Sequence, residues 1–238
     1  MRTGQGAWSR RGFLSVLGGA TLVGLRRGAS PALAAEAGMK KIPLGFDNFS
    51  IRAFGWKAPQ LIDYAASVKA DVLLISDLDS FESLEETHLE TLKARAAEKQ
   101  VQLQVGTGSI CPTSKSYNQK KWGPAEDHLR LLIRVARTIA SPVARCYLGT
   151  REDRGGDGGI YRHMEETVKV CKAVRQQAVD AGVKIAIENH AGDMQAWELV
   201  TLIEAAGKEY VGATFDSGNS TWTLEDPITT TSSSNRAV

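Results

Sequence analysis

Short apolar runs alternate with longer amphipathic segments from residue 40 onward. The runs recur every 27 to 42 residues, which is the spacing expected when a helix follows each strand and returns the chain to the next parallel strand. The pattern therefore predicts six parallel strands at residues 41–49, 71–76, 101–108, 143–150, 183–190 and 210–216.

Two of the intervening segments have the apolar spacing of helices. Residues 125–140 follow Pro124, expected at the first helical position, and carry acids in the first turn, both typical of a helix start. Residues 161–182 end at Gly182, which is typical of a helix end. The apolar positions at helical spacing are Leu129, Leu132, Ile133 and Ala136 in the first segment, and Met164, Val168, Cys171 and Val174 in the second.

An alternation of strands and helices fits either an open doubly wound sheet or a closed barrel. A dinucleotide-binding sheet would carry G-x-G-x-x-G after its first strand, but the first strand is followed by "DNFSIRAFGWKAP". The glycine-rich "RGGDGG" at 154–159 follows the fourth strand and lacks the lysine and serine of a P-loop. We therefore predict an α/β protein of the (β/α)8 TIM-barrel type, with about six βα units.

Each predicted strand ends in polar residues, where a barrel of this type places its active site. Side chains alternate along a strand, so Glu188 and His190 face one way and Asn189 the other. Asp216 ends the next strand, and a divalent cation is the simplest way to hold two neighbouring carboxylates together. The spacing alone leaves open that Glu188 and Asp216 instead cap helices or pair with Arg or Lys.

Other polar residues near strand ends are candidates for substrate binding, each with a structural alternative. His190 is a substrate contact, a metal ligand or a hydrogen-bonded loop residue, and Asn219 lies three residues after Asp216. Asp47 could contact substrate or cap a turn. Lys115 and Arg151 could bind an anionic group, or they could be solvated loop charges. Trp222 and Trp56 could form the walls of a sugar site, or they could be packed aromatic residues.

The remaining histidines lie in the predicted helical segments, away from the strand ends. We expect His88, His128 and His163 at the surface. Cys111, Cys146 and Cys171 are odd in number and lack C-x-x-C spacing, so no disulfide is required and burial is the expected role for the two in apolar runs.

The first 35 residues have the features of a twin-arginine export signal. Arg10 and Arg11 precede an apolar stretch of about 14 residues, shorter than the roughly 20 that cross a bilayer, and an A-x-A site follows at 32–34. We therefore expect a periplasmic or secreted protein without a stable membrane anchor. Removing the signal's five arginines leaves 24 basic and 27 acidic residues, a balance that argues against nucleic-acid binding.

Two of these stretches, "GVKIAIENHAGD" and "EYVGATFDSGNSTWTLEDP", resemble the xylose-isomerase-like TIM barrel superfamily, the sugar phosphate isomerase/epimerase group. "LGFDNFSIRAFGWKAPQLIDYA" and "TGSICPTSK" are similar to the same group, so the resemblance spans about residues 42–227. It implies a metal held by a glutamate and an aspartate ending the fifth and sixth strands, matched here by Glu188 and Asp216, and by a histidine and a glutamate ending the seventh and eighth.

The chain departs from this pattern after "TLEDP", where only "ITTTSSSNRAV" follows, without histidine or acid. Two of the four implied ligand positions therefore have no counterpart, and we expect a barrel truncated after its sixth unit. The expected organisation is a signal at 1–35, a partial barrel at 40–227 and a disordered Thr/Ser-rich tail at 228–238.

The resemblance implies a sugar or sugar-acid isomerase or epimerase that uses Mn2+ or Mg2+ and moves a proton beside a carbonyl, with Glu188 as the catalytic carboxylate. A lyase acting on an oxo-sugar at the same site, or a truncated carbohydrate-binding protein without catalysis, are the alternatives. An abasic-site endonuclease on the same barrel is disfavoured by the acidic balance. The expected partner is a small carbohydrate, with no nucleic acid, and association into a homo-oligomer is left open.

Overall fold

The computed structural model describes residues 42–228. The predicted export signal and the tail from residue 229 lie outside this range and stay predictions. Six strands within the range form one parallel sheet in chain order. They are β1 (Gly45–Asp47), β2 (Val72–Ile75), β3 (Gln102–Ser109), β4 (Val143–Tyr147), β5 (Lys184–Glu188) and β6 (Val211–Thr214). All six predicted strands are confirmed, most of them shorter than predicted.

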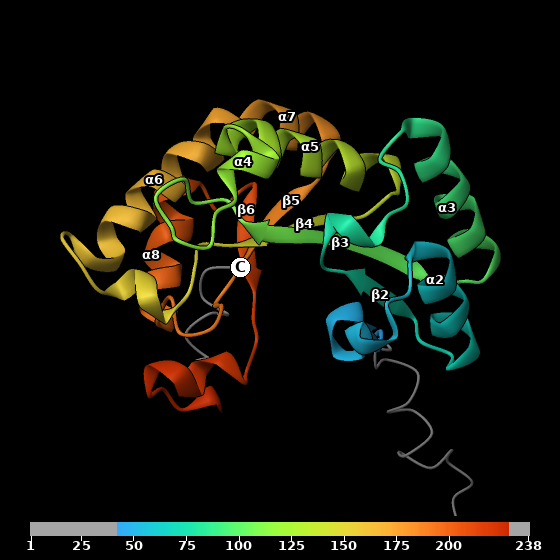
Figure 1. Ribbon diagram of the computed structural model, residues 1–238, viewed down its shortest axis with the longest axis horizontal. Coiled ribbons are helices and arrows are strands. Elements are labelled where there is room, and N and C mark those ends of the chain that lie inside the picture. Colours follow the sequence, from blue (N-terminus) through green and yellow to red (C-terminus); the bar gives the residue numbers. More distant parts are fainter. Residues whose placement is uncertain (1–41, 229–238) are drawn as a thin grey trace, which may run out of the picture. The chain divides into compact units, whose positions relative to one another are not determined.

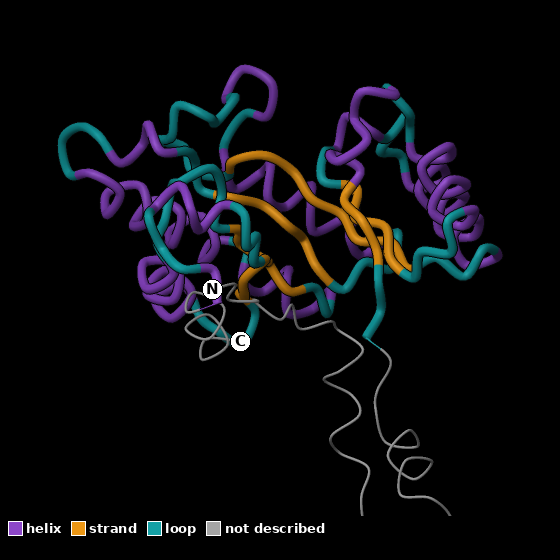
Figure 2. Tube along the Cα trace, turned by 90° about the horizontal axis from the view of Figure 1, so that it is seen from below, coloured by secondary structure: helices purple, strands orange, loops and turns teal. Residues whose placement is uncertain are grey.

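The longer helices lie along one face of the curved sheet, so the strands run inside an arc of helices (Figures 1 and 2). No helix within residues 42–228 is long and apolar enough to span a membrane. The α-helices are α2 (Ala58–Ser67), α3 (Glu86–Glu98), α4 (Gln119–Trp122), α5 (Ala125–Thr138), α6 (Gly159–Ala173), α7 (Arg175–Ala181) and α8 (Ala196–Ala206). Short 3-10 helices are η2 (Asn48–Phe54), η3 (Leu78–Ser80), η4 (Arg151–Arg154) and η5 (Asn219–Thr223).

The two helical predictions have different outcomes. Helix α5 is confirmed, with Pro124 as the residue before its first turn. The predicted helix at 161–182 is two helices, because Val174 between α6 and α7 has φ −111° while its side chain stays buried. Gly182 ends α7 at φ 63°, the left-handed conformation that glycine adopts without steric cost.

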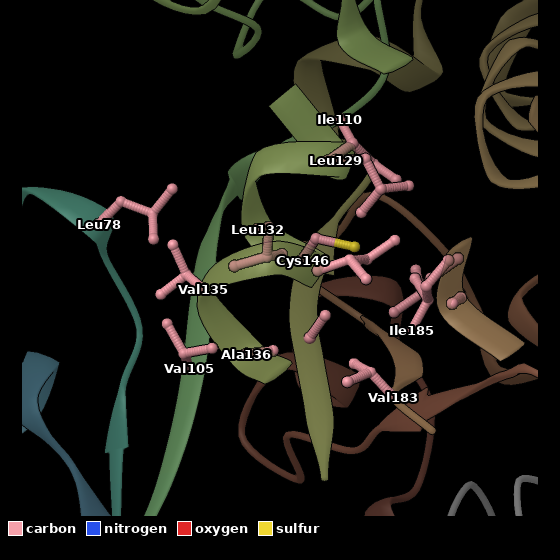
Figure 3. Packing of buried hydrophobic residues seen from close by; sticks show 14 of the residues in the cluster. Leu78, Val105, Ile110, Leu129, Leu132, Val135, Ala136, Cys146, Val183 and Ile185 are labelled. Atoms are coloured by element: carbon pink, nitrogen blue, oxygen red, sulfur yellow. The ribbon is translucent and has the colours of Figure 1, made fainter. Parts of the chain in front are cut away.

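The hydrophobic core lies between the sheet and the helices (Figure 3). Leu129, Leu132 and Ala136 of α5 face the sheet side of the helix, as the helical spacing predicts, and are fully buried. A buried leucine contributes roughly 1.5–3 kcal/mol, so this layer holds the helices on the sheet. The three cysteines are free and buried, whereas burial was expected for two of them.

On the sheet face opposite the helices, a glycine of one strand lies beside a long side chain of the next strand. Gly106 of β3 is in register with Arg145 of β4. A Cβ atom on Gly106 would lie 2.9 Å from Arg145 Cδ and 3.0 Å from the Arg145 carbonyl oxygen, closer than side chains normally approach. Glycine at position 106 therefore makes room for the Arg145 side chain to lie across β3.

We predict that Gly106→Ala lowers the free energy of unfolding by about 1–3 kcal/mol, because Arg145 and its backbone must move to admit the methyl group. Urea denaturation of the purified chain measures this. Gly155→Ala is the matched control, because its Cβ would meet only the Glu152 carbonyl oxygen at 3.7 Å, and a change within about 0.5 kcal/mol is expected. Equal stability of the two variants would contradict the packing of Arg145 across β3.

Candidate active site

A cavity of about 530 Å³ opens at the edge of the sheet where the strands end. All six strands or the residues directly after them contribute to its lining, because parallel strands bring their carboxyl ends to one edge. The lining residues are Asp47, Phe49, Leu74, Ser76, Asp77, Gly108, Arg145, Tyr147, Glu188, His190, Thr214, Phe215, Asp216, Ser217 and Asn219.

Glu188, the last residue of β5, forms a buried ion pair with Arg145 of β4. The Arg145 Nε lies 2.6 Å from Glu188 Oε2, Nη2 contacts the same oxygen, and the two side chains are only 9% and 8% exposed. Arg145 Nη1 also donates to the Thr107 carbonyl oxygen at 3.0 Å. Burial raises the pKa of Glu188, while the positive charge of Arg145 opposes that shift. The result is a buried carboxylate held in one orientation toward the cavity.

Asp216 is positioned by two asparagines. The Asn189 side chain accepts from the Asp216 backbone N–H at 2.8 Å and donates to the Asp216 carbonyl oxygen at 2.9 Å. The Asn219 amide Nδ2 lies 3.1 Å from Asp216 Oδ2 and 3.4 Å from Glu188 Oε1. One amide nitrogen therefore lies between the two carboxylates, which places their oxygens within reach of a common donor.

His190 lies flat on Tyr147, with ring centroids 3.7 Å apart and an interplanar angle of 10°. Its Nδ1 is 2.8 Å from the Gly149 carbonyl oxygen; a carbonyl only accepts, so Nδ1 carries the proton and Nε2 is an acceptor. Burial lowers the pKa of His190, which keeps the ring neutral. A neutral imidazole at this position can accept a hydrogen bond from a substrate hydroxyl.

The turn after β5 is closed by Asp193, which is fully buried. Its carboxylate accepts from the backbone N–H groups of His190 at 2.9 Å, Met194 at 2.6 Å and Gly149 at 3.1 Å. Burial raises the pKa of Asp193 to about 7, outweighing the effect of the three N–H donors. Asp193 therefore ties the loop after β4 to the loop that carries His190.

Asp47 both caps a helix and lines the cavity. Its Oδ1 accepts from the Phe49 N–H at the start of η2 at 2.9 Å and from the Ser76 hydroxyl at 2.6 Å. Asn48 adds a bond from the Ser76 N–H to its Oδ1 at 2.9 Å. These bonds join the ends of β1 and β2, so Asp47 is held at the rim.

The structure gathers some of the predicted site residues and separates others. Glu188, His190, Asp47, Asn219 and Asp216 all line the cavity, and Asn189 faces away from it, as the alternation along β5 predicts. Four other candidates lie outside the lining. The Lys115 side chain is 73% exposed, with its Nζ 3.8 Å from a Glu152 carboxylate oxygen, and Arg151 lies in η4. Trp222 on η5 is 57% exposed, and Trp56 is stacked on Phe54.

Sequence reasoning missed Arg145, Tyr147 and Asp193, which shape the cavity and its loops. The signal for Arg145 was a charged residue inside the apolar run "VARCYLGT"; such a charge is rarely buried without a partner. The expectation of a surface position for His128 was wrong. It is 1% exposed, stacked on Trp122 and 2.9 Å from the Thr107 hydroxyl, because it lies on the buried face of α5.

The donor set partly meets the requirements of a divalent cation. Glu188 and Asp216 supply the hard carboxylate oxygens that such an ion prefers, and the Asn219 amide nitrogen already bridges them. Within residues 42–228, no group of three His, Cys, Asp or Glu side chains is placed to hold a metal ion. The described residues therefore fit two positions of a metal's coordination shell.

The sequence matches the family model described as xylose isomerase-like TIM barrel over residues 32–236. A search of curated proteins finds no match. Ninety chains of solved structures match the fold. Their identities to this chain, given below for three of them, are low enough that these likenesses show the fold alone.

Two of the three are epimerases. The 3-keto-D-glucoside 4-epimerase YcjR from E. coli, in its apo form, has a TM-score of 0.64 at 11% identity, covering 83% of this chain and 77% of that one. D-psicose 3-epimerase in the presence of D-fructose has a TM-score of 0.58 at 15% identity, covering 75% and 64%. The IolI protein with a bound zinc atom has a TM-score of 0.59 at 14% identity, covering 75% and 64%. This chain thus spans about 64% of the length of several of its structural neighbours.

We predict that Arg145→Met destabilises the protein by about 3–5 kcal/mol at pH 7, because Glu188 loses its partner while still buried. The double variant Arg145→Met/Glu188→Gln removes the buried charge as well and is expected to recover much of that loss. Urea denaturation of both variants gives the comparison. A double variant no more stable than Arg145→Met would show that the ion pair is not what the single substitution disrupts.

Asp193 gives a pH-dependent stability. Its pKa in the folded protein is raised from 3.8 to about 7, so the folded state holds this proton more tightly than the unfolded chain. The stabilisation is complete below about pH 4 and is lost as the pH rises through about 7. Between pH 5 and pH 8 we expect the native chain to lose stability relative to Asp193→Asn, by up to about 1.4 kcal/mol per pH unit. Urea denaturation of both proteins at each pH measures this. A free energy of unfolding that changes equally with pH in both proteins would contradict the prediction.

Proposed function

Because this chain belongs to the xylose isomerase-like TIM barrel family, we propose that its cavity binds a small carbohydrate and moves a proton on a carbon beside a carbonyl group. The reaction class is isomerisation or epimerisation of a sugar or sugar acid. The epimerases among the structural neighbours support this class.

The observation that carries the proposal is the pairing of Glu188 and Asp216 at neighbouring strand ends, joined through the Asn219 amide inside one cavity. Glu188 acts as the base that takes the proton. Its burial raises its pKa and so makes its ionised form a stronger base, and Arg145 holds the carboxylate in place. His190 Nε2, Asp47 and Asn219 orient the substrate by accepting from or donating to its hydroxyl groups.

A divalent metal ion, Mn2+ or Mg2+, is part of the proposal. Glu188 and Asp216 would hold it, and it would polarise the substrate carbonyl and acidify the neighbouring carbon. The IolI structure, similar in fold, has a bound zinc atom, which supports a metal as part of the proposal. Lys115, Arg151 and Trp222 stay proposals for contacts to a substrate that extends beyond the cavity.

A lyase is the second candidate on the same residues. Dehydration of an oxo-sugar also begins with loss of a proton beside a carbonyl, so Glu188 would serve it as the base. Decarboxylation leaves an enolate at the same position, to which Glu188 in its protonated form would return a proton. A protein that binds carbohydrate without catalysis is the third, since the described residues offer two metal ligands.

We predict that the purified chain with Mn2+ exchanges a sugar's carbon-bound hydrogen for deuterium in D2O, measured by proton NMR. Glu188→Gln should slow this exchange by about 100-fold or more, the range expected for loss of a general base. Glu98→Gln on α3 is the matched control, because that exposed residue lies outside the cavity lining.

The outcomes separate the three candidates. Exchange accompanied by release of water or carbon dioxide would identify the lyase. Saturable sugar binding without exchange at any metal concentration would identify the binding protein. Equal exchange rates for Glu188→Gln and the native chain would remove Glu188 from the mechanism. Equilibrium dialysis with Mn2+ alone tests the metal site independently, with weaker binding expected for Glu188→Gln and for Asp216→Asn.

A further inference from the structure

The charge of the cavity lining is unbalanced. From the part of the chain that the structure describes, four carboxylates line it, those of Asp47, Asp77, Asp216 and Glu188, against one guanidinium from Arg145. The lining therefore carries a net charge of −3. A divalent ion held by Glu188 and Asp216 would bring this to −1, still without a positive surplus.

Arg145, the one cation of the lining among residues 42–228, is already engaged by three neighbours. Arg145 donates to Glu188 through Nε and Nη2 and to the Thr107 carbonyl oxygen through Nη1, and its guanidinium carbon lies 5.3 Å from the Tyr147 ring centroid. Recruiting Arg145 to a phosphate or carboxylate would leave Glu188 buried without a partner, which is costly. His190 does not compensate, because its Nδ1 hydrogen is already donated to the Gly149 carbonyl oxygen at 2.8 Å.

Basic residues near the rim have partners of their own. Lys121 pairs with the Asp79 carboxylate, and Lys57 Nζ donates to the Asp79 carbonyl oxygen at 2.6 Å. The Arg52 guanidinium lies 4.0 Å from the Phe49 ring centroid and donates to the Phe49 carbonyl oxygen at 2.8 Å. None of the three is among the residues that line the cavity.

The rest of the lining suits an uncharged polyol. Asp47 and Asp77 each use Oδ1 for backbone caps, of η2 and η3, and each has a second carboxylate oxygen that can accept from a hydroxyl. Phe49, 60% exposed, Leu74 and Phe215 supply apolar surface for the C–H faces of a sugar ring.

We propose that this cavity selects uncharged sugars, free ketoses or aldoses, and discriminates against sugar phosphates and sugar carboxylates. The inference rests on the proposed function, since it specifies the substrate class of the same cavity. The Debye length at physiological salt is about 8 Å, so an anionic group that enters the cavity among these carboxylates is repelled by them.

Isothermal titration of the full chain with D-fructose and D-tagatose, each against its own 6-phosphate, tests the inference. We expect each phosphate to bind about tenfold or more weakly than its parent sugar, with and without Mn2+. Asp47→Asn/Asp77→Asn keeps both caps but brings the lining to −1, and should reduce the discrimination several-fold. Glu98→Gln on α3 should leave it unchanged.

The outcomes distinguish this inference from the function on which it rests. Phosphates that bind as tightly as the parent sugars would overturn the charge selection and leave carbohydrate binding intact. Discrimination unchanged in Asp47→Asn/Asp77→Asn would also overturn it, since the carboxylates would not be its cause. Failure of every sugar and phosphate to bind would remove the proposed function, and the inference with it.

Discussion

The constraint on which the site depends is that all six strands of the described residues run in the same direction and pair in chain order. Each strand then delivers the residues at its carboxyl end to the same edge of the sheet. Residues as distant in sequence as Asp47, Arg145 and Asp216 meet in one cavity for this reason. The helices on the outer face keep the strands in this order by burying their apolar sides, so core packing and site geometry are two results of one arrangement.

The carboxylates gathered at one edge of the sheet repel one another. The fold relieves this repulsion in different ways for buried and for exposed carboxylates. The buried Glu188 has a fixed cation, Arg145, because an ionised group out of contact with water needs a charged partner. The more exposed Asp216 carboxylate accepts from the Asn219 side-chain amide and from the backbone N–H groups of Gly218 and Asn219. Asp193 is surrounded by backbone N–H groups, and its carboxylate fastens two loops. The surface that faces the cavity keeps an excess of negative charge.

Much of the fold could be predicted from the sequence, because strands buried between helices read as apolar runs at regular intervals. The location of Glu188, His190 and Asp216 followed from where those runs end. The roles of Arg145 and Asp193 could not be read the same way, because each depends on a partner about 40 residues away. The break at Val174 was also hidden, since its side chain fits the helical spacing and only its backbone departs from it. His128 was misplaced because it was judged by its polar side chain, whereas its spacing, four residues before Leu132, puts it on the buried face of α5.

The close approach of Gly106 to Arg145 restricts how this site can change over evolutionary time. A side chain at position 106 would meet the Arg145 side chain at 2.9 Å from Cδ. Replacing Arg145 by a shorter residue would relieve this contact but would leave Glu188 buried without its partner unless Glu188 had changed too. Descendants that lose the glycine first pass through a less stable intermediate. The three positions are thus expected to vary together or not at all, and lineages that abandon the carboxylate are the ones free to fill the space above β3.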